Sequence, residues 1–215
     1  INWTVDIDGV KSEPRRDTAG PLFEQVVQLL VVAEQQSHRE KAKRDVAILH
    51  LLYALGLRQM EVRNLTLVDY EPAHAKGPSV WITGKGHRER ERVSVPPASR
   101  EALETWLLLR GNAPGPLFVK LSRNKTGKSA HLSRRAMVRT LDKLGKAIGI
   151  RVRPHGLRHT AITNLLDKTN GDVRAVRRFS RHARIETLMK YDDARHDVAG
   201  DLATKLADEL TGKKK

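Results

Sequence analysis

The residues of this sequence that could do chemistry gather near its C-terminal end, in the segment 153–191, which contains His155, Arg158, His182 and Tyr191. A tyrosine hydroxyl titrates at about pH 10, so it is a useful nucleophile only where its developing charge is stabilised. Arginine stays charged and presents planar, forked donors that match phosphate oxygens. Histidine accepts or donates a proton near neutral pH. This combination suits attack of a tyrosine on a phosphodiester, with arginines in the place of a metal ion.

Helical periodicity in the same segment indicates how these side chains are positioned. Two apolar patterns of helical spacing lie on either side of the Thr-Asn-Gly-Asp sequence at 169–172, and Asp172 suits the N-cap of the second helix. Ile185 and Leu188 indicate a third short helix. The polar residues therefore lie at helix starts and ends, where they can converge on one pocket. Taken singly, each of these residues is more often an ordinary residue of a basic DNA-binding domain, and a lone tyrosine on a helix usually serves packing.

The sequence H-G-L-R-H-T at 155–160, followed by His182 and Tyr191, resembles the tyrosine recombinase (phage integrase) family, whose signature is R…K…H-x-x-R…H/W…Y. Two earlier segments also match: GLRQMEVRNLTLVDY resembles the family's first arginine box, and Gly-Lys-Gly at 84–86 resembles its lysine turn. The resemblance covers roughly residues 22–191. It implies the catalytic residues Arg58, Lys85, His155, Arg158, His182 and Tyr191, with Glu61 and His159 in supporting roles.

Each box is ambiguous by itself. Arg58 could be a charge at a helix C-terminus that is favoured by the helix dipole. Lys85 could be an ordinary lysine at the tip of a surface turn. The sequence also departs from the family's usual L-G-H before the histidine, because Arg181 stands where glycine is common. This substitution leaves the backbone geometry next to His182 in question.

The resemblance implies a mechanism that needs neither metal, ATP nor another cofactor. Arg58 and Arg158 would hold the scissile phosphate, and His155 would accept a proton or orient a neighbour. His182 would hydrogen-bond the phosphate, and Tyr191 would attack it to form a 3′-phosphotyrosyl link. The lysine of the Gly-Lys-Gly turn would protonate the departing 5′ oxygen. A 5′ hydroxyl from a partner strand would then reverse these steps.

Composition favours double-stranded DNA as the partner. The chain of 215 residues carries a formal net charge of +15, which favours a polyanion, although a solvated basic surface or a membrane surface could also explain it. No apolar run approaches the length of a membrane span, and the absence of cysteine fits a reducing cytosol. We expect a cytoplasmic, nucleoid-associated protein. The segment 120–135 is the densest in positive charge, and its candidate DNA-binding residues are Arg123, Lys125, Lys128, Arg134 and Arg135.

The expected fold is mainly α with a small three-stranded antiparallel sheet (α+β), like a tyrosine recombinase catalytic domain. Buried helices are expected at 22–33 and 46–57, with a helix end and a turn between them. Further helices are expected at 98–109 and after Ser133. Short strands are expected at 67–70, 79–83 and 90–95.

The predicted organisation is a linker or short segment at 1–21, a catalytic domain at 22–196, and a C-terminal helix with a basic tail at 197–215. The family's N-terminal DNA-clamping domain is expected to be absent from this chain. An apolar stripe of residues four apart in 197–210 could mediate self-association into a synaptic tetramer on DNA. Two other functions remain open: DNA relaxation like that of a type IB topoisomerase, and DNA binding without catalysis.

Overall fold

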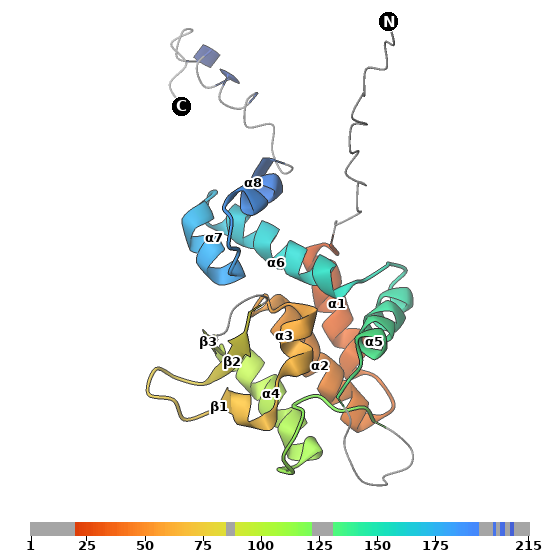
Figure 1. Ribbon diagram of the computed structural model, residues 1–215. Coiled ribbons are helices and arrows are strands. Elements are labelled where there is room, and N and C mark those ends of the chain that lie inside the picture. Colours follow the sequence, from red (N-terminus) through yellow and green to blue (C-terminus); the bar gives the residue numbers. More distant parts are fainter. Residues whose placement is uncertain are drawn as a thin grey trace, which may run out of the picture.

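The computed structural model describes residues 20–84, 89–121 and 131–193, together with a few isolated positions beyond residue 199. Most of the described elements are helices, and the strands form one small sheet, so the predicted fold class is confirmed (Figure 1). The elements are, in chain order, α1 (Phe23–Glu34), α2 (Arg39–Tyr53), α3 (Gln59–Asn64), the 3-10 turn η1 (Leu67–Asp69), β1 (Tyr70–Glu71), β2 (Ser79–Thr83), β3 (Arg90–Ser94), α4 (Pro97–Arg110), α5 (Arg134–Ala147), α6 (Pro154–Lys168), α7 (Val173–Ser180) and α8 (Glu186–Asp193).

Helix α2 lies at the centre of the hydrophobic core and packs against α1, α4 and α6 (Figure 1). Its residues Ile48, Leu49, Leu51 and Leu52 are all fully buried. A helix that is apolar around most of its circumference must be covered on several sides. This central helix therefore gives a rigid support to the loop that follows it, where the first arginine box lies.

The first half of α2 differs from the sequence prediction, which placed a helix end and a turn before residue 46. The helix already begins at Arg39, where the ring of the N-cap residue His38 accepts a backbone hydrogen bond. Further along, Arg44 and Asp45 form a buried ion pair of 2.7 Å, and Arg44 also donates to the carbonyl of Val119. Charged residues can be helical and buried here because each has a partner, which apolar periodicity does not reveal.

The sheet is antiparallel with the order β1-β2-β3, and Val80 pairs with both Tyr70 and Val93. Strand β2 has the predicted bounds and β3 is one residue shorter than predicted. The predicted first strand is mostly the turn η1, because the Asp69 carboxylate accepts hydrogen bonds of 2.7 Å from the backbone N–H and the hydroxyl of Thr66. Such a side-chain cap favours a turn over an extended strand.

Helices α6, α7 and α8 form a second, smaller cluster above the main core (Figure 1). The buried residues of this cluster are Ile162, Leu166, Val176 and Leu188. The predicted N-cap of α7 is confirmed, since the side chain of Asp172 accepts a 2.9 Å hydrogen bond from the backbone of Ala175. Helix α6 also contacts α2, so it connects the small cluster to the main core.

The predicted C-terminal helix at 197–210 lies for the most part outside the described residues, as does most of the predicted linker at 1–21. Within the ranges that the structure describes, no helix is long and apolar enough to cross a membrane.

Candidate active site

Arg58 lies in the loop between α2 and α3, where it is the N-cap residue of α3. The chain leaves α2 through Gly56, which has a left-handed φ of 55°. A Cβ atom at this position would lie 2.7 Å from the ring of Phe179, so only glycine fits without a shift. The backbone N–H and the Nη1 of Arg58 each donate a 2.7 Å hydrogen bond to the Glu61 carboxylate. These contacts fix the direction of the Arg58 guanidinium.

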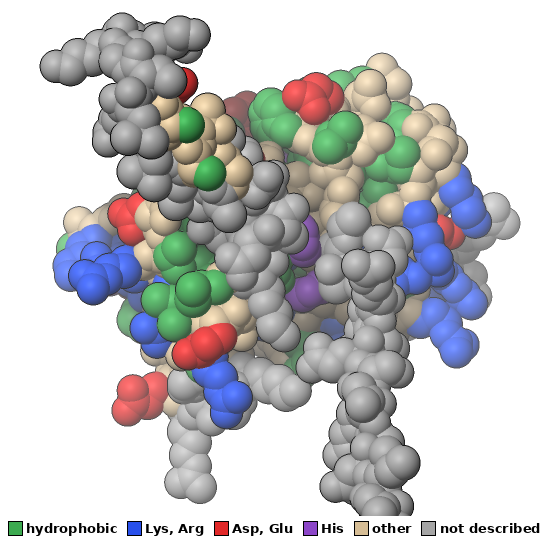
Figure 2. All heavy atoms as spheres, turned by 90° about the horizontal axis from the view of Figure 1, so that it is seen from above, with side chains coloured by type: hydrophobic (Ala, Val, Ile, Leu, Met, Phe, Trp, Pro, Cys, Tyr) green, Lys and Arg blue, Asp and Glu red, His purple; other side chains and the backbone are tan. Residues whose placement is uncertain are grey.

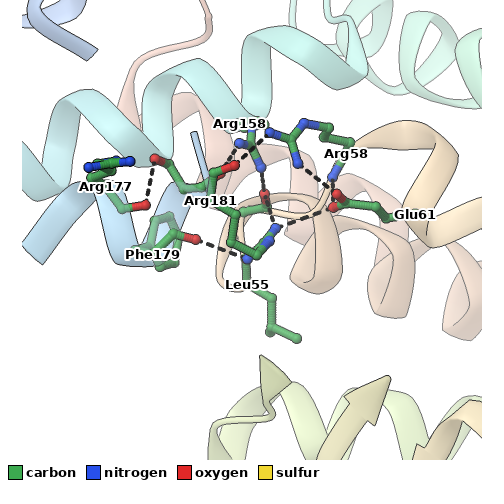
Figure 3. Close-up of polar contacts among 9 residues, drawn as sticks. Leu55, Arg58, Glu61, Arg158, Arg177, Phe179 and Arg181 are labelled. Carbon is green, nitrogen blue, oxygen red and sulfur yellow. Dashed lines mark hydrogen bonds and ion pairs between the residues drawn. The ribbon is translucent and has the colours of Figure 1, made fainter. Parts of the chain in front are cut away.

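Arg158 lies on α6 and is 1% exposed. Its Nη1 donates to the carbonyl of Gly56, and its Nη2 donates to the carbonyl of Ser180 at the end of α7. Figure 3 shows this side chain beside Arg58, between the loop after α2 and the C-terminus of α7. A guanidinium has five N–H groups, and these two hydrogen bonds occupy two of them. Arg158 thus joins three separate elements at one point.

The histidines and the tyrosine meet next to these arginines. The ring of Tyr191, on α8, lies 4.5 Å from the ring of His159 and 6.0 Å from that of His182. Burial lowers the pKa of His155, at the start of α6, and the nearby charges of Arg158 and Arg58 lower it further. The Nδ1 atom of His182 is buried and has no hydrogen-bond partner within the described part of the chain. Figure 2 shows histidine side chains near the middle of the face seen from above.

The electrostatics of the site keep the arginines charged and the histidines neutral. Burial, and then the charges of Arg58 and Arg181, lower the pKa of Arg158 to about 9, which leaves it protonated at neutral pH. Burial, followed by Arg158 and Arg58, lowers the pKa of His182 to about 4, so its imidazole is neutral. Burial raises the pKa of Tyr191, and the two arginines oppose this shift. The tyrosine is therefore protonated at neutral pH, and a neutral imidazole lies beside it that can accept a proton.

The structure brings together five of the six expected catalytic residues, together with Glu61 and His159. Lys85 lies outside the described residues. So do three of the expected DNA-binding residues, Arg123, Lys125 and Lys128. The other two, Arg134 and Arg135, are exposed at the start of α5, whose predicted N-cap is confirmed because Ser133 Oγ accepts a 3.1 Å hydrogen bond from the backbone of Ala136.

Two arginines that sequence reasoning did not place in the site also belong to it. Arg181 pairs with Glu61 at 3.2 Å, and its carbonyl accepts a 3.0 Å hydrogen bond from Arg58 Nη2. Arg177 donates to the carbonyls of His182 and Ala183, at 3.1 and 2.9 Å, and so holds the backbone that carries His182. For Arg181, the only signal in the sequence was that an arginine stands where the family usually has glycine. For Arg177, the sequence contained no signal.

Residues 22–197 match the sequence pattern of the Phage integrase family. The chain belongs to this family. It is 38% identical over 207 residues to a tyrosine recombinase of Synechococcus elongatus, covering 94% of this chain and 62% of that protein. It is also 38% identical over 154 residues to the tyrosine recombinase XerC of Pseudomonas aeruginosa, covering 70% of this chain and 47% of XerC. The chain thus spans roughly half to two thirds of the length of these relatives.

Solved structures of recombinases share the fold of this integrase-family domain. The crystal structure of XerA recombinase matches with a TM-score of 0.66 at 21% identity, over 92% of this chain and 66% of XerA. The XerH site-specific recombinase bound to its difH substrate, in a pre-cleavage complex, matches with a TM-score of 0.66 at 20% identity, over 86% of this chain and 52% of XerH. At these identities the likeness concerns the fold.

Glu61 is the carboxylate that pairs with two of the arginines of this integrase-family site, Arg58 and Arg181. It is 5% exposed and accepts hydrogen bonds from Arg58 and Arg181. Burial alone would raise the pKa of Glu61, but the Arg58 backbone N–H and the two guanidinium groups outweigh it, and the pKa lies below its ordinary value. Folding therefore stabilises the ionised form of this side chain.

Substitution of Glu61 by glutamine is expected to lower the free energy of unfolding by about 3 kcal/mol at pH 7, because it leaves the Arg181 guanidinium, which is largely buried, without its counter-charge. A carboxylate whose pKa is lowered by folding stabilises the protein above its unfolded pKa, and this contribution is lost as the pH falls through the folded value. The difference between the two proteins should therefore shrink below about pH 4. Urea denaturation of both proteins at several pH values measures it.

Glu34→Gln is the matched control for this experiment. Glu34 is paired with Lys43, but the side chains of the two residues are 48% and 28% exposed. Exposed ion pairs contribute little to stability, so the control should unfold almost like the wild type at every pH. A Glu61→Gln protein as stable as the wild type at pH 7 would contradict the structural role of Glu61.

Proposed function

We propose that this chain carries the catalytic domain of a site-specific DNA recombinase or integrase, which cleaves and rejoins DNA strands through a 3′-phosphotyrosyl intermediate. One observation carries the proposal: two guanidinium groups, two neutral imidazoles and a tyrosine converge from four separate segments of the chain. Tyrosine is a nucleophile for phosphorus only beside such charge-stabilising groups.

In the proposed cleavage step, Tyr191 Oη forms a bond to the scissile phosphorus, and the bond from phosphorus to the 5′ oxygen breaks. The phenolic proton passes to the neutral imidazole of His155. Arg58 and Arg158 donate their remaining N–H groups to the nonbridging oxygens, where charge accumulates. The leaving 5′ oxygen takes a proton from Lys85. In the return step a 5′ hydroxyl attacks the phosphotyrosine, so the bond energy is retained and neither ATP nor a metal ion is consumed.

The proposed partner is double-stranded DNA. XerH was solved with its difH substrate, and the Tn1549 transposon integrase with transposon right-end DNA. In this chain, contacts to DNA phosphates are assigned to the basic segment 120–135, which includes Arg134 and Arg135 at the start of α5. We further propose that the protein assembles into a synaptic tetramer on DNA and that segment 197–210 is the docking element. The proposed location is the cytoplasm, at the nucleoid.

DNA binding is expected to weaken steeply with salt, because neutralisation of phosphates by lysine and arginine releases counterions. With about six phosphate contacts, affinity for a short duplex should fall by about 1,000-fold between 50 and 200 mM salt. The double substitution Arg134→Ala/Arg135→Ala should reduce the slope of log affinity against log salt by about 2. Fluorescence anisotropy with a labelled duplex measures both slopes. A double variant with the wild-type slope would remove these arginines from the interface.

A trapping assay tests the proposed function. The protein is incubated with a nicked duplex that carries the attachment sequence, identified from the genomic flanks, and the products are separated on a denaturing gel. A covalent protein–DNA band supports the phosphotyrosyl intermediate. Binding to this duplex with no such band would instead indicate a non-catalytic DNA-binding domain. Relaxation of supercoiled DNA that is independent of a second DNA site would indicate a type IB topoisomerase activity.

A further inference from the structure

Arg181 occupies a backbone position that an arginine does not normally favour. It follows α7 in the left-handed conformation, with φ 54° and ψ 40°. This conformation brings the Cβ atom of an L-residue close to its own backbone, and glycine adopts it with much less strain. The arginine is therefore retained at a conformational cost, which its side-chain contacts must offset.

The side chain of Arg181 points into the protein, and its guanidinium makes four hydrogen bonds. Its Nη1 donates to the carbonyls of Phe179 at 2.9 Å and Leu55 at 3.4 Å. Its Nη2 donates to the carbonyl of Gly56 at 3.1 Å and to Glu61 at 3.2 Å. Figure 3 shows this guanidinium between the loop after α2 and Glu61. Both terminal nitrogens have used their N–H groups, and the remaining Nε is buried without a partner among the described residues.

Arg181 differs in this respect from the two arginines assigned to the phosphate. Arg58 makes two side-chain hydrogen bonds, to Glu61 and to the Arg181 carbonyl, and its side chain is 33% exposed. It therefore keeps N–H groups for a ligand, whereas Arg181 has none within reach of solvent. Arg181 is a structural neighbour of the anion site and not one of its ligands.

The contacts of Glu61 show what Arg181 controls. One oxygen of this carboxylate accepts from Arg58 Nη1, while the other accepts from the Arg58 backbone and from Arg181. Arginine and carboxylate groups favour a bidentate pairing in which both terminal nitrogens meet both oxygens. Because Arg181 occupies the second oxygen, Arg58 is held to a single side-chain contact with Glu61. Without Arg181, the Arg58 guanidinium could turn onto both oxygens.

We propose that Arg181 is a positioning residue for strand cleavage: it shares Glu61 with Arg58 and thereby keeps the Arg58 guanidinium directed at the scissile phosphate. The proposal rests on the proposed function. It also explains why a strained arginine can replace glycine beside His182, since the side chain connects the end of α7 to the loop that carries Arg58.

The test compares two variants. Arg181→Gly relieves the strain of the left-handed backbone conformation, and Arg181→Lys keeps the positive charge but lacks the planar guanidinium with two terminal nitrogens. The control is Arg174→Ala, whose side chain is exposed on the same helix. With saturating nicked attachment-site duplex, Arg181→Gly should form the covalent complex about 10- to 100-fold more slowly, as expected for a misplaced binding group. Its DNA affinity should stay close to that of the control. Its thermal midpoint should fall, because the buried pair with Glu61 is lost, but the protein should remain folded at the assay temperature. The lysine should recover part of the rate.

A double variant shows whether Arg181 acts through Arg58. In the Arg58→Ala background, Arg181→Gly should cause little further loss, because coupled residues are non-additive. The proposal is overturned if Arg181→Gly cleaves at the wild-type rate, if its loss of rate matches a loss of folded protein, or if the full loss persists without Arg58.

A second measurement separates this proposal from the function on which it rests. Inorganic phosphate is titrated into both proteins, and binding is followed by the NMR signals of the His182 imidazole. Arg181→Gly should bind phosphate at least about tenfold more weakly than the wild type, because Arg58 turns toward Glu61. If the wild type forms no covalent complex, the proposed function fails, and this titration alone decides the role of Arg181. Equal phosphate affinities would overturn it.

Discussion

Tyr191→Phe is expected to abolish the covalent DNA complex, with a loss of at least about 10,000-fold in cleavage, since the nucleophile itself is removed. The phenyl ring can keep the packing against His159, whose ring lies 4.5 Å away. The fold and the DNA affinity should therefore remain. Denaturing gels of nicked-duplex reactions measure the cleavage, and anisotropy measures the binding.

Tyr53→Phe provides a matched control for this experiment. It also deletes a phenolic hydroxyl, but this one accepts a 2.9 Å hydrogen bond from Asn164 and lies between α2 and α6. We expect a small loss of stability, about 1 kcal/mol, and cleavage at the wild-type rate. A covalent complex formed by Tyr191→Phe at a rate near that of the wild type would exclude Tyr191 as the nucleophile.

Arg158→Ala is expected to reduce cleavage at saturating DNA by about 100- to 1,000-fold, the range found when a donor to a developing oxyanion is removed. It should also lower the free energy of unfolding by about 3 kcal/mol, because the carbonyl of Ser180 loses its charged donor. Arg158→Lys keeps the charge but cannot reach Gly56 and Ser180 with one planar fork, so it should recover little of the rate.

Arg134→Ala is the control for the Arg158 variants, because it removes one positive charge that lies outside the candidate active site. This residue is exposed at the start of α5, so its removal should weaken DNA binding at moderate salt and leave cleavage at saturating DNA unchanged. Single-turnover cleavage rates and denaturant unfolding of all three variants make the comparison. Wild-type cleavage by Arg158→Ala would show that the catalytic residues have been assigned wrongly.

Much of the fold was predictable from local patterns. The helices around Leu141 and Ile162 follow apolar periodicity, and the caps Ser133 and Asp172 accept the hydrogen bonds that their types predict. Strand β2 also has its predicted bounds. In these segments the local preference and the tertiary contacts agree, so short-range reasoning is sufficient.

Other features depended on residues far apart in the chain. The start of α2 was missed because its charged residues are stabilised by contacts such as that of Arg44 with Val119. Likewise, nothing in the local sequence indicates that Arg177 holds the carbonyl of His182. An ion pair or a carbonyl contact has no periodicity, so pattern reading does not detect it.

The sequence by itself determined the types and the order of the reactive groups, because a helical spacing and a short motif are local properties. Only the tertiary structure decided which groups share a carboxylate and which remain available to a ligand. Arg58, Arg158 and Arg181 carry the same side chain, yet Arg58 and Arg158 each make two side-chain hydrogen bonds, whereas Arg181 makes four and both of its terminal nitrogens are fully occupied. That difference arises from burial and hydrogen-bond partners, which exist only once α2, α6 and α7 have packed together.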